Sequence, residues 1–151
     1  MPKETAAITK LIAVSSVGLM QGNYAKIPFL FKYLYGTVFH SLLSDKLGME
    51  RVVAHAANKP WTDEEPAAGF LPDGWKSQLP QPGFLKDALI IRVAKLMNDE
   101  CIADEKGLDA YHVSTKELSG STISREDVGH FIVEQALKNW SKYNGWVFVS
   151  Y

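Results

Sequence analysis

Residues 88–93 read Ala-Leu-Ile-Ile-Arg-Val, a run in which apolar residues follow one another without alternation. A strand with one wet face alternates apolar and polar residues, whereas a continuous apolar run is typical of a strand that is buried on both faces. Such strands belong to parallel sheets that carry helices on both sides. The run therefore predicts an α/β fold built around a buried strand.

Three other segments predict further strands. Residues 11–14 form a second continuous apolar run, which ends in small polar residues at Ser15 and Ser16. Residues 110–114 predict a short strand, and residues 146–149 predict a final one, because both are short, rich in β-branched and aromatic residues, and bounded by polar residues or glycine. Together with the first run, these segments predict a sheet of three to four strands.

Two helices are predicted between these strands. Pro28 occupies a favourable first helical position, and apolar residues at roughly helical spacing follow it as far as Ala57. Ser124 and Asp127 give a capping-box-like start to a second helix, whose apolar face continues to Trp140. Strands that alternate with helices predict a mostly parallel sheet with crossover helices.

A proline-rich segment interrupts this pattern at residues 58–86, which contain five of the seven prolines. Proline removes backbone donors and disfavours helix in the residue before it, so regular structure should be brief here. Long loops in compact domains are often functional lids. Trp61, Phe70 and Trp75 either close over an apolar substrate or only anchor the loop, and we assign them to substrate binding. We predict one domain over residues 1–151, with this loop as an insertion.

Composition and charge narrow the class of protein. The 151 residues are 46% apolar and 22% charged, which is typical of one compact domain. A net charge of −1 gives no excess of basic residues that would bind the phosphates of nucleic acid. Lysines interrupt the apolar stretches before they reach the ~20 residues that cross a membrane. The single cysteine, Cys101, rules out an internal disulfide, and the four histidines lack metal-ligand spacing. We expect a cytoplasmic protein that binds no metal, no membrane and no nucleic acid.

Several motifs, taken in order, resemble one known family. They are Val-Ser-Ser-Val-Gly at residues 14–18, Ser-Asp-Lys at 44–46 with Met-Glu at 49–50, Tyr-His-Val-Ser-Thr-Lys at 111–116, and Ile-Ser-Arg-Glu-Asp-Val-Gly-His-Phe-Ile at 123–132. This set is similar to the C-terminal half of the atypical short-chain dehydrogenases of the NmrA-like, NAD(P)-binding kind. The resemblance implies a truncated Rossmann-like domain.

The resemblance also indicates what the chain lacks. Members of the family begin with a strand, a glycine-rich turn and a helix that hold the dinucleotide, but no G-x-G-x-x-G occurs here. In the broader family a Tyr lies four residues before a Lys that lowers the pKa of the phenol. Lys46 matches that Lys, but Leu42 stands at the Tyr position. The resemblance therefore implies that the nucleotide-binding half is missing and that no cofactor is bound.

The candidate catalytic residues follow from the same resemblance. Ser15 and Ser16 end the first strand, where α/β sheets place ligands, and a serine at this place in the family polarises the substrate. The alternative is that these serines only bond local backbone. Lys46 either orients a substrate oxygen or is a solvated lysine. Tyr35 or His40 would replace the lost Tyr in moving a proton.

We interpret the chain as a cofactor-independent enzyme that acts on a small, apolar, ring-bearing molecule in a biosynthetic pathway, by isomerisation, cyclisation or elimination. Arg92 lies where the family's strand ends in Arg-Pro, and we assign it to substrate binding. Two alternatives stay open: a fragment of an NAD(P)H-dependent reductase whose nucleotide-binding half comes from elsewhere, and a non-catalytic NmrA-like regulatory protein. Because a sheet cut through its middle exposes an edge strand, we also expect a homodimer.

Overall fold

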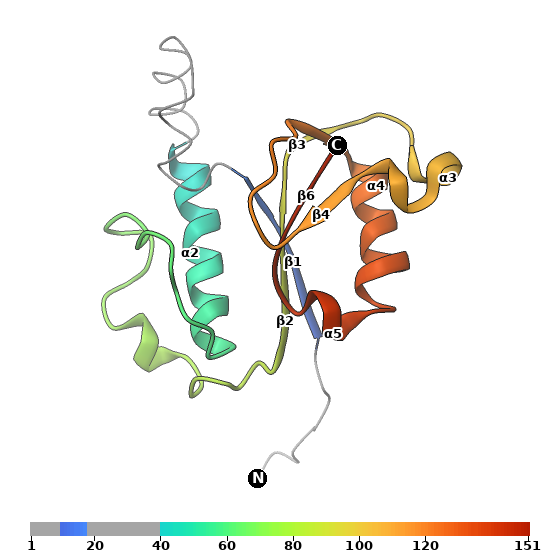
Figure 1. The fold of residues 1–151 in the computed structure, drawn as a ribbon. Helices are drawn as coiled ribbons and strands as arrows, with labels where there is room; N and C mark the ends of the chain where they lie inside the picture. Colours follow the sequence, from blue (N-terminus) through green and yellow to red (C-terminus); the bar gives the residue numbers. More distant parts are fainter. Residues whose placement is uncertain (1–9, 18–39) are drawn as a thin grey trace.

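The structure is a computed structural model, and it describes residues 10–17 and 40–151. Its elements, in chain order, are β1 (Lys10–Ser16), α2 (His40–Ala56), η3 (Trp75–Gln78), β2 (Asp87–Val93), β3 (Lys95–Met97), α3 (Ala103–Lys106), η4 (Gly107–Ala110), β4 (His112–Ser114), β5 (Thr122–Ser124), α4 (Arg125–His130), η5 (Phe131–Ala136), α5 (Trp140–Tyr143) and β6 (Gly145–Ser150). Figure 1 shows the longer helices on both sides of one sheet. The predicted α/β class is confirmed.

The main sheet has four strands in the order β1-β2-β6-β4. Strands β1, β2 and β6 are parallel, and β4 pairs antiparallel with β6. The predicted mostly parallel sheet is therefore confirmed. A second, two-stranded sheet joins β3 to β5 in parallel, and the sequence patterns did not indicate it. Strands of three residues have too few positions to show a period.

Strand β2 lies inside the main sheet, between β1 and β6, as its continuous apolar sequence predicts. All of its residues after the first are buried. Ala88 and Ile90 pack in the cluster that includes α2, whereas Leu89, Ile91 and Val93 pack in the larger core on the other face. Figure 1 shows α2 on one side of this strand and α4 and α5 on the other. Burial of each aliphatic side chain stabilises the fold by about 1.5–3 kcal/mol. Because β2 buries side chains on both of its faces, it holds the two layers together.

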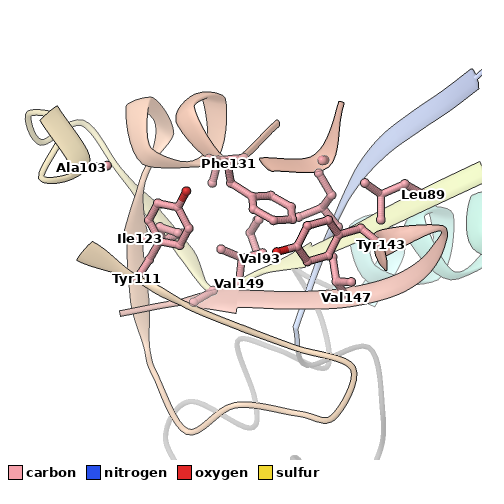
Figure 2. Close-up of a cluster of buried hydrophobic side chains, with 13 residues drawn as sticks. Leu89, Val93, Ala103, Tyr111, Ile123, Phe131, Tyr143, Val147 and Val149 are labelled. Carbon is pink, nitrogen blue, oxygen red and sulfur yellow. The ribbon is translucent and has the colours of Figure 1, made fainter. Parts of the chain in front are cut away.

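The larger core fills the space between the sheet and the helical elements that follow β5. Figure 2 shows the rings of Phe131 and Tyr143 lying together over β6, beside Val147 and Val149. Phe131 packs edge-to-face against Tyr143, with 5.2 Å between the ring centroids, and against Tyr111, at 6.2 Å. Aromatic pairs of this kind add about 0.5–1.5 kcal/mol beyond the area they bury. They fix the helical layer against the central strands.

The helix predicted after Ser124 begins at the expected residue but is not one regular helix. Ser124 Oγ accepts a hydrogen bond from the backbone N–H three residues later, at 2.9 Å, which confirms the predicted N-cap. Helix α4 then passes into the π-helical η5, and the Leu137 amide donates to the Ile132 carbonyl, five residues earlier, at 3.0 Å. The wider turn places Phe131 and Ala136 in the core together. A regular helical period does not bury two residues five positions apart in this way.

Helix α2 covers the other face of the sheet and continues unbroken from His40 to Ala56. The earlier part of the predicted helix, residues 28–39, lies outside the described residues. Segment 58–86 follows α2 and contains only one short helical element, η3, as its prolines predict. Figure 1 shows this segment lying beside α2, away from α4 and α5. The α2 side of the sheet therefore carries both a helix and an irregular covering segment.

Candidate functional site

Strand β2 carries one charged residue into the layer between the sheet and α2. Arg92 is 3% exposed, and in the register of the sheet it lies opposite Ser15 of β1 and Phe148 of β6. Residues directly opposite each other in neighbouring strands point to the same face. A buried charge destabilises the fold unless it has partners, so the partners of Arg92 define a candidate site.

Glu50 of α2 is the first partner of Arg92, and it is fully buried. Arg92 Nε donates to Oε1 at 3.2 Å and to Oε2 at 3.0 Å, and Arg92 Nη2 donates to Oε2 at 2.5 Å. Trp146 Nε1 donates to the same Oε2 at 2.9 Å. The carboxylate therefore occupies the side of the guanidinium formed by Nε and Nη2, and it fixes the plane of the Arg92 head.

Asp63 of the proline-rich segment is the second partner, because Arg92 Nη2 also donates to Asp63 Oδ2. Burial alone would lower the pKa of Arg92, but the hydrogen bonds and charges of Glu50 and Asp63 raise it, so the guanidinium stays protonated. One cation with two carboxylates gives these three residues, the Arg92 cluster, a formal charge of −1. Among the described residues, no group accepts a hydrogen bond from Arg92 Nη1 or donates one to Asp63 Oδ1.

A cavity of about 430 Å³ opens beside the Arg92 cluster. The described residues that line it come from β2, β6, the start of the proline-rich segment and the turn after β4, and are Pro60, Trp61, Thr62, Asp63, Arg92, Thr115, Lys116, Glu117, Trp146 and Phe148. Trp61, Trp146 and Phe148 provide aromatic walls, and Arg92 Cζ lies 5.5 Å from the centroid of the Phe148 ring. The volume falls in the range of small-molecule sites, about 300–1,000 Å³.

Arg51 of α2 anchors the segment that forms one wall of the cavity. Arg51 Nε donates to both carboxylate oxygens of Glu65 at 3.0 Å. Its Cζ also lies 5.5 Å from the ring centroids of Trp61 and of Trp75. These contacts hold the segment against α2 independently of the Asp63 ion pair. The wall therefore does not depend on Asp63 alone for its position.

The two predicted serines have different surroundings. Ser15 is buried beside Arg92 in the register of the sheet, and its Oγ has no hydrogen-bond partner among the described residues. Ser16 Oγ donates to the carbonyl of Val17 at 3.0 Å. This is the local backbone bond that the sequence left open as the alternative for Ser16. Neither serine is among the residues that line the cavity.

Of the other three predicted catalytic residues, only Lys46 has a side chain that the structure describes. Lys46 is half-buried on α2 and does not line the cavity. His40 begins α2, but its side chain is outside the description, and Tyr35 lies wholly outside the described residues. The roles proposed for these three residues stay predictions.

Two of the four predicted substrate-binding residues, Arg92 and Trp61, line the cavity. Trp75 instead packs edge-to-face on His55 of α2, with 5.4 Å between the ring centroids, which is the anchoring role that the sequence left open. Phe70 is half-buried and does not line this cavity. An irregular segment has no period that orients its side chains, so sequence alone does not separate its lining residues from its anchors.

Sequence reasoning missed Glu50, Trp146 and Phe148 as site residues. One signal was present, because an arginine within an apolar buried strand requires a buried carboxylate from the element packed on that face. Glu50 lies on the predicted helix at the spacing of its buried face, three residues after Leu47. Asp63 belongs to the acidic run Asp63-Glu64-Glu65 of the proline-rich segment. Nothing in the sequence indicates which acid of that run turns inward.

A second buried charge lies on the α4 side of the sheet. Asp127, in the first turn of α4, is fully buried. It accepts hydrogen bonds from the side chains of Cys101, Ser124 and Tyr151 and from the backbone N–H groups of Ile102 and Ala103. Burial alone would raise the pKa of Asp127, but these hydrogen bonds lower it to about 2. We call these residues the Asp127 cluster.

The Asp127 cluster leaves Cys101 without the features of a nucleophile. Burial, and then the hydrogen bond to Asp127, raise the pKa of Cys101 to about 11. The thiol is therefore protonated at neutral pH, whereas reactive cysteines are thiolates. The cluster ties the start of α4 to the loop before α3 and to Tyr151, which is a structural role.

Comparison of the chain with models of known families, with curated proteins and with solved structures gives no match. Within residues 10–17 and 40–151, no three His, Cys, Asp or Glu residues are placed to hold a metal ion. None of the helices in this described part combines the length and the apolar character that a membrane span requires. The Arg92 cluster and its cavity therefore provide the basis for a functional proposal.

Proposed function

We propose that the protein is a cofactor-independent enzyme that moves a proton within a small, apolar, ring-bearing molecule, in an isomerisation, cyclisation or elimination. One observation carries the proposal: the ion pair of Asp63 and Arg92 lies in the wall of an aromatic cavity. A carboxylate accepts protons, and a guanidinium stabilises an oxygen that gains negative charge. The side chains of Arg92 and Asp63 are only 4% and 12% exposed, and an electrostatic interaction with a substrate is stronger for groups that are mostly removed from water.

Asp63 is the proton acceptor in this proposal. Its Oδ2 accepts from Arg92, which leaves Oδ1 to take a proton from the substrate. The substrate's bond to hydrogen breaks, an O–H bond forms on Asp63, and the electron pair stays on the substrate. Return of the proton to a different atom completes an isomerisation, and departure of a leaving group completes an elimination. Neither sequence oxidises or reduces the substrate.

Arg92 stabilises the charge that this proton transfer creates. Its Nη1 donates to the substrate oxygen on which negative charge develops. Glu50 acts as a positioning residue because it holds the guanidinium from the opposite side, and Trp146 acts through Glu50 because it donates to the same carboxylate. A preorganised donor of this kind contributes about 3 kcal/mol to the stability of a transition state. Ser15, Lys46, Tyr35 and His40 stay predicted contributors without a derived step.

The strand order supports a truncated Rossmann-like fold as part of the proposal. Three parallel strands with helices on both faces, next to an antiparallel edge strand, are compatible with one half of a doubly wound sheet. In chain order, the motifs that resemble the NmrA-like dehydrogenases fall at the end of β1, on α2, on β4, and on β5 with α4. We favour the hypothesis of a cofactor-independent enzyme over that of a reductase, because the sequence has no G-x-G-x-x-G to hold a dinucleotide.

The compound 5-nitrobenzisoxazole tests the proposed base directly. This neutral, ring-bearing probe opens when a base removes its carbon-bound C3 proton and the N–O bond breaks, which yields a coloured phenolate. We expect saturable acceleration by the wild-type protein and a loss on the order of 100-fold in Asp63→Asn. Glu65→Gln is the matched control, because Glu65 is an acid of the same segment that does not line the cavity. Equal rates in Asp63→Asn and wild type would overturn the proposal.

A titration with NADPH separates the reductase alternative. Trp61 and Trp146 lie in the cavity wall, so tryptophan fluorescence reports a ligand that enters it. We expect no saturable response to NADPH in the micromolar range. A saturable response would favour the reductase and contradict the cofactor-independent reading.

A further inference from the structure

The guanidinium of Arg92 has two edges that each fit a carboxylate, and neither edge has both of its nitrogens free for a ligand. The edge formed by Nε and Nη2 is occupied by Glu50. The edge formed by Nη1 and Nη2 is half occupied, because Nη2 also donates to Asp63. A carboxylate ligand binds arginine best through two parallel hydrogen bonds. Only Nη1 is available to such a ligand, so it can form one of these two hydrogen bonds. A neutral ligand with a single oxygen acceptor needs only one donor.

The charge of the site opposes an anion in the same way. The Arg92 cluster has a formal charge of −1 although it contains the arginine. Among the lining residues that the structure describes, the other two charged ones, Lys116 and Glu117, have opposite signs. The lining therefore does not offset the negative excess. Like charges placed close together in a partly buried site disfavour binding strongly.

We infer that the cavity selects neutral ring-bearing molecules and rejects carboxylates, and that Asp63 is the residue that sets this preference. This inference rests on the proposed function, because it assigns a substrate class to the same site. A neutral ligand with one oxygen acceptor next to an acidic hydrogen matches the pair in the wall. The oxygen accepts from Arg92 Nη1, and the hydrogen faces Asp63 Oδ1. The ring of the ligand packs against Trp61 and Trp146.

Two ligands of nearly equal size test the selection. The compound 2-acetylnaphthalene is a neutral methyl ketone, and 2-naphthoate is a carboxylate on the same ring system. We expect calorimetry at pH 7.5 to give a dissociation constant for the ketone that is about tenfold or more below that for the carboxylate. Removal of one negative charge in Asp63→Asn should tighten binding of the carboxylate by about tenfold or more and change binding of the ketone far less. Glu65→Gln is again the matched control and should bind both ligands as wild type does.

A second variant keeps the test valid if Asp63→Asn does not fold. Thr62 is exposed and lines the cavity, so Thr62→Lys adds a positive charge without touching the ion pair. It should also tighten binding of 2-naphthoate. Wild-type protein that binds 2-naphthoate as tightly as the ketone, or charge variants that leave its affinity unchanged, would overturn the inference. The proton-transfer proposal would survive that result, because its own probe is neutral and reports a rate.

Discussion

The two faces of the central sheet each bury a charged cluster, but the buried charge is stabilised by different kinds of partner in the two clusters. On the α4 face, Asp127 accepts only from neutral N–H, O–H and S–H groups. On the α2 face, Arg92 is balanced by two carboxylates, and one of these comes from an irregular segment. No residue of the first cluster is among the described residues that line the 430 Å³ cavity, whereas the second cluster forms part of its wall.

Because of this difference we treat the Asp127 cluster as structural and propose the Arg92 cluster as a functional site. The Asp127 carboxylate has both oxygens occupied by five donors from the chain, which leaves no position for a ligand. The Arg92 cluster has an excess negative charge and atoms that no described group engages. Glu50 and Asp127 are equally buried, so burial does not distinguish the two clusters. They differ in whether each polar atom of the cluster has a hydrogen-bond partner.

The largest effect is expected when the Arg92 cluster loses its cation. Arg92→Met leaves the carboxylate of Glu50 buried without a partner charge, which should lower the free energy of unfolding by about 3–5 kcal/mol. Urea denaturation followed by circular dichroism measures this change. The double variant Arg92→Met with Glu50→Leu removes the fully buried pair and leaves only Asp63, whose side chain is 12% exposed. It should recover most of the loss, because well-packed apolar residues can replace a buried ion pair. A double variant as unstable as the single one would contradict this account.

The Asp127 cluster should show itself in the response to acid. The pKa of Asp127 is about 2 in the folded protein, against an ordinary value of 3.8. The unfolded chain therefore takes up a proton at higher pH than the folded chain. The contribution of this group is complete above about pH 4 and falls by about 2 kcal/mol as the pH drops to about 2.

Asp127→Asn isolates this effect from the titration of other acids. The variant is expected to be less stable than wild type at pH 6, because the asparagine amide cannot accept all five hydrogen bonds. The difference in the free energy of unfolding between wild type and variant should shrink as the pH falls from 4 to 2. A difference that stays constant over this range would show that Asp127 has an ordinary pKa in the folded protein.

The sequence predicts the fold better than the site, and the reason is physical. The continuous apolar run in β2 and the cap at Ser124 are local patterns, and local geometry is enough to interpret them. The sequence did not predict the passage from α4 into the π-helical η5 or the small β3–β5 sheet. Both depend on contacts that form only when the layers pack.

The candidate site depends even more on contacts between distant segments. Arg92, Glu50 and Trp146 come from three elements that meet only in the folded sheet. Arg92 and Trp61 were predicted and do line the cavity, whereas Ser16 bonds its own backbone neighbourhood. The homodimer and the roles of Tyr35 and His40 stay predictions. Arg92 was assigned through the family resemblance, and its place within an apolar strand is a further signal of a buried partner that sequence reasoning did not use.

The smallest effect is expected at the exposed ion pair of Arg51 and Glu65, which tests whether burial or charge gives the Arg92 cluster its energetic weight. The side chain of Glu65 is 65% exposed, although Arg51 Nε donates to both of its oxygens at 3.0 Å. Water screens such a pair, so Glu65→Gln should change the free energy of unfolding by less than about 0.5 kcal/mol. Arg51 keeps its positions near Trp61 and Trp75, so the wall of the cavity should stay in place. Urea denaturation of this variant beside Arg92→Met measures the contrast directly. A loss in Glu65→Gln close to that of Arg92→Met would show that the covering segment, rather than the buried ion pair, holds the α2 face together.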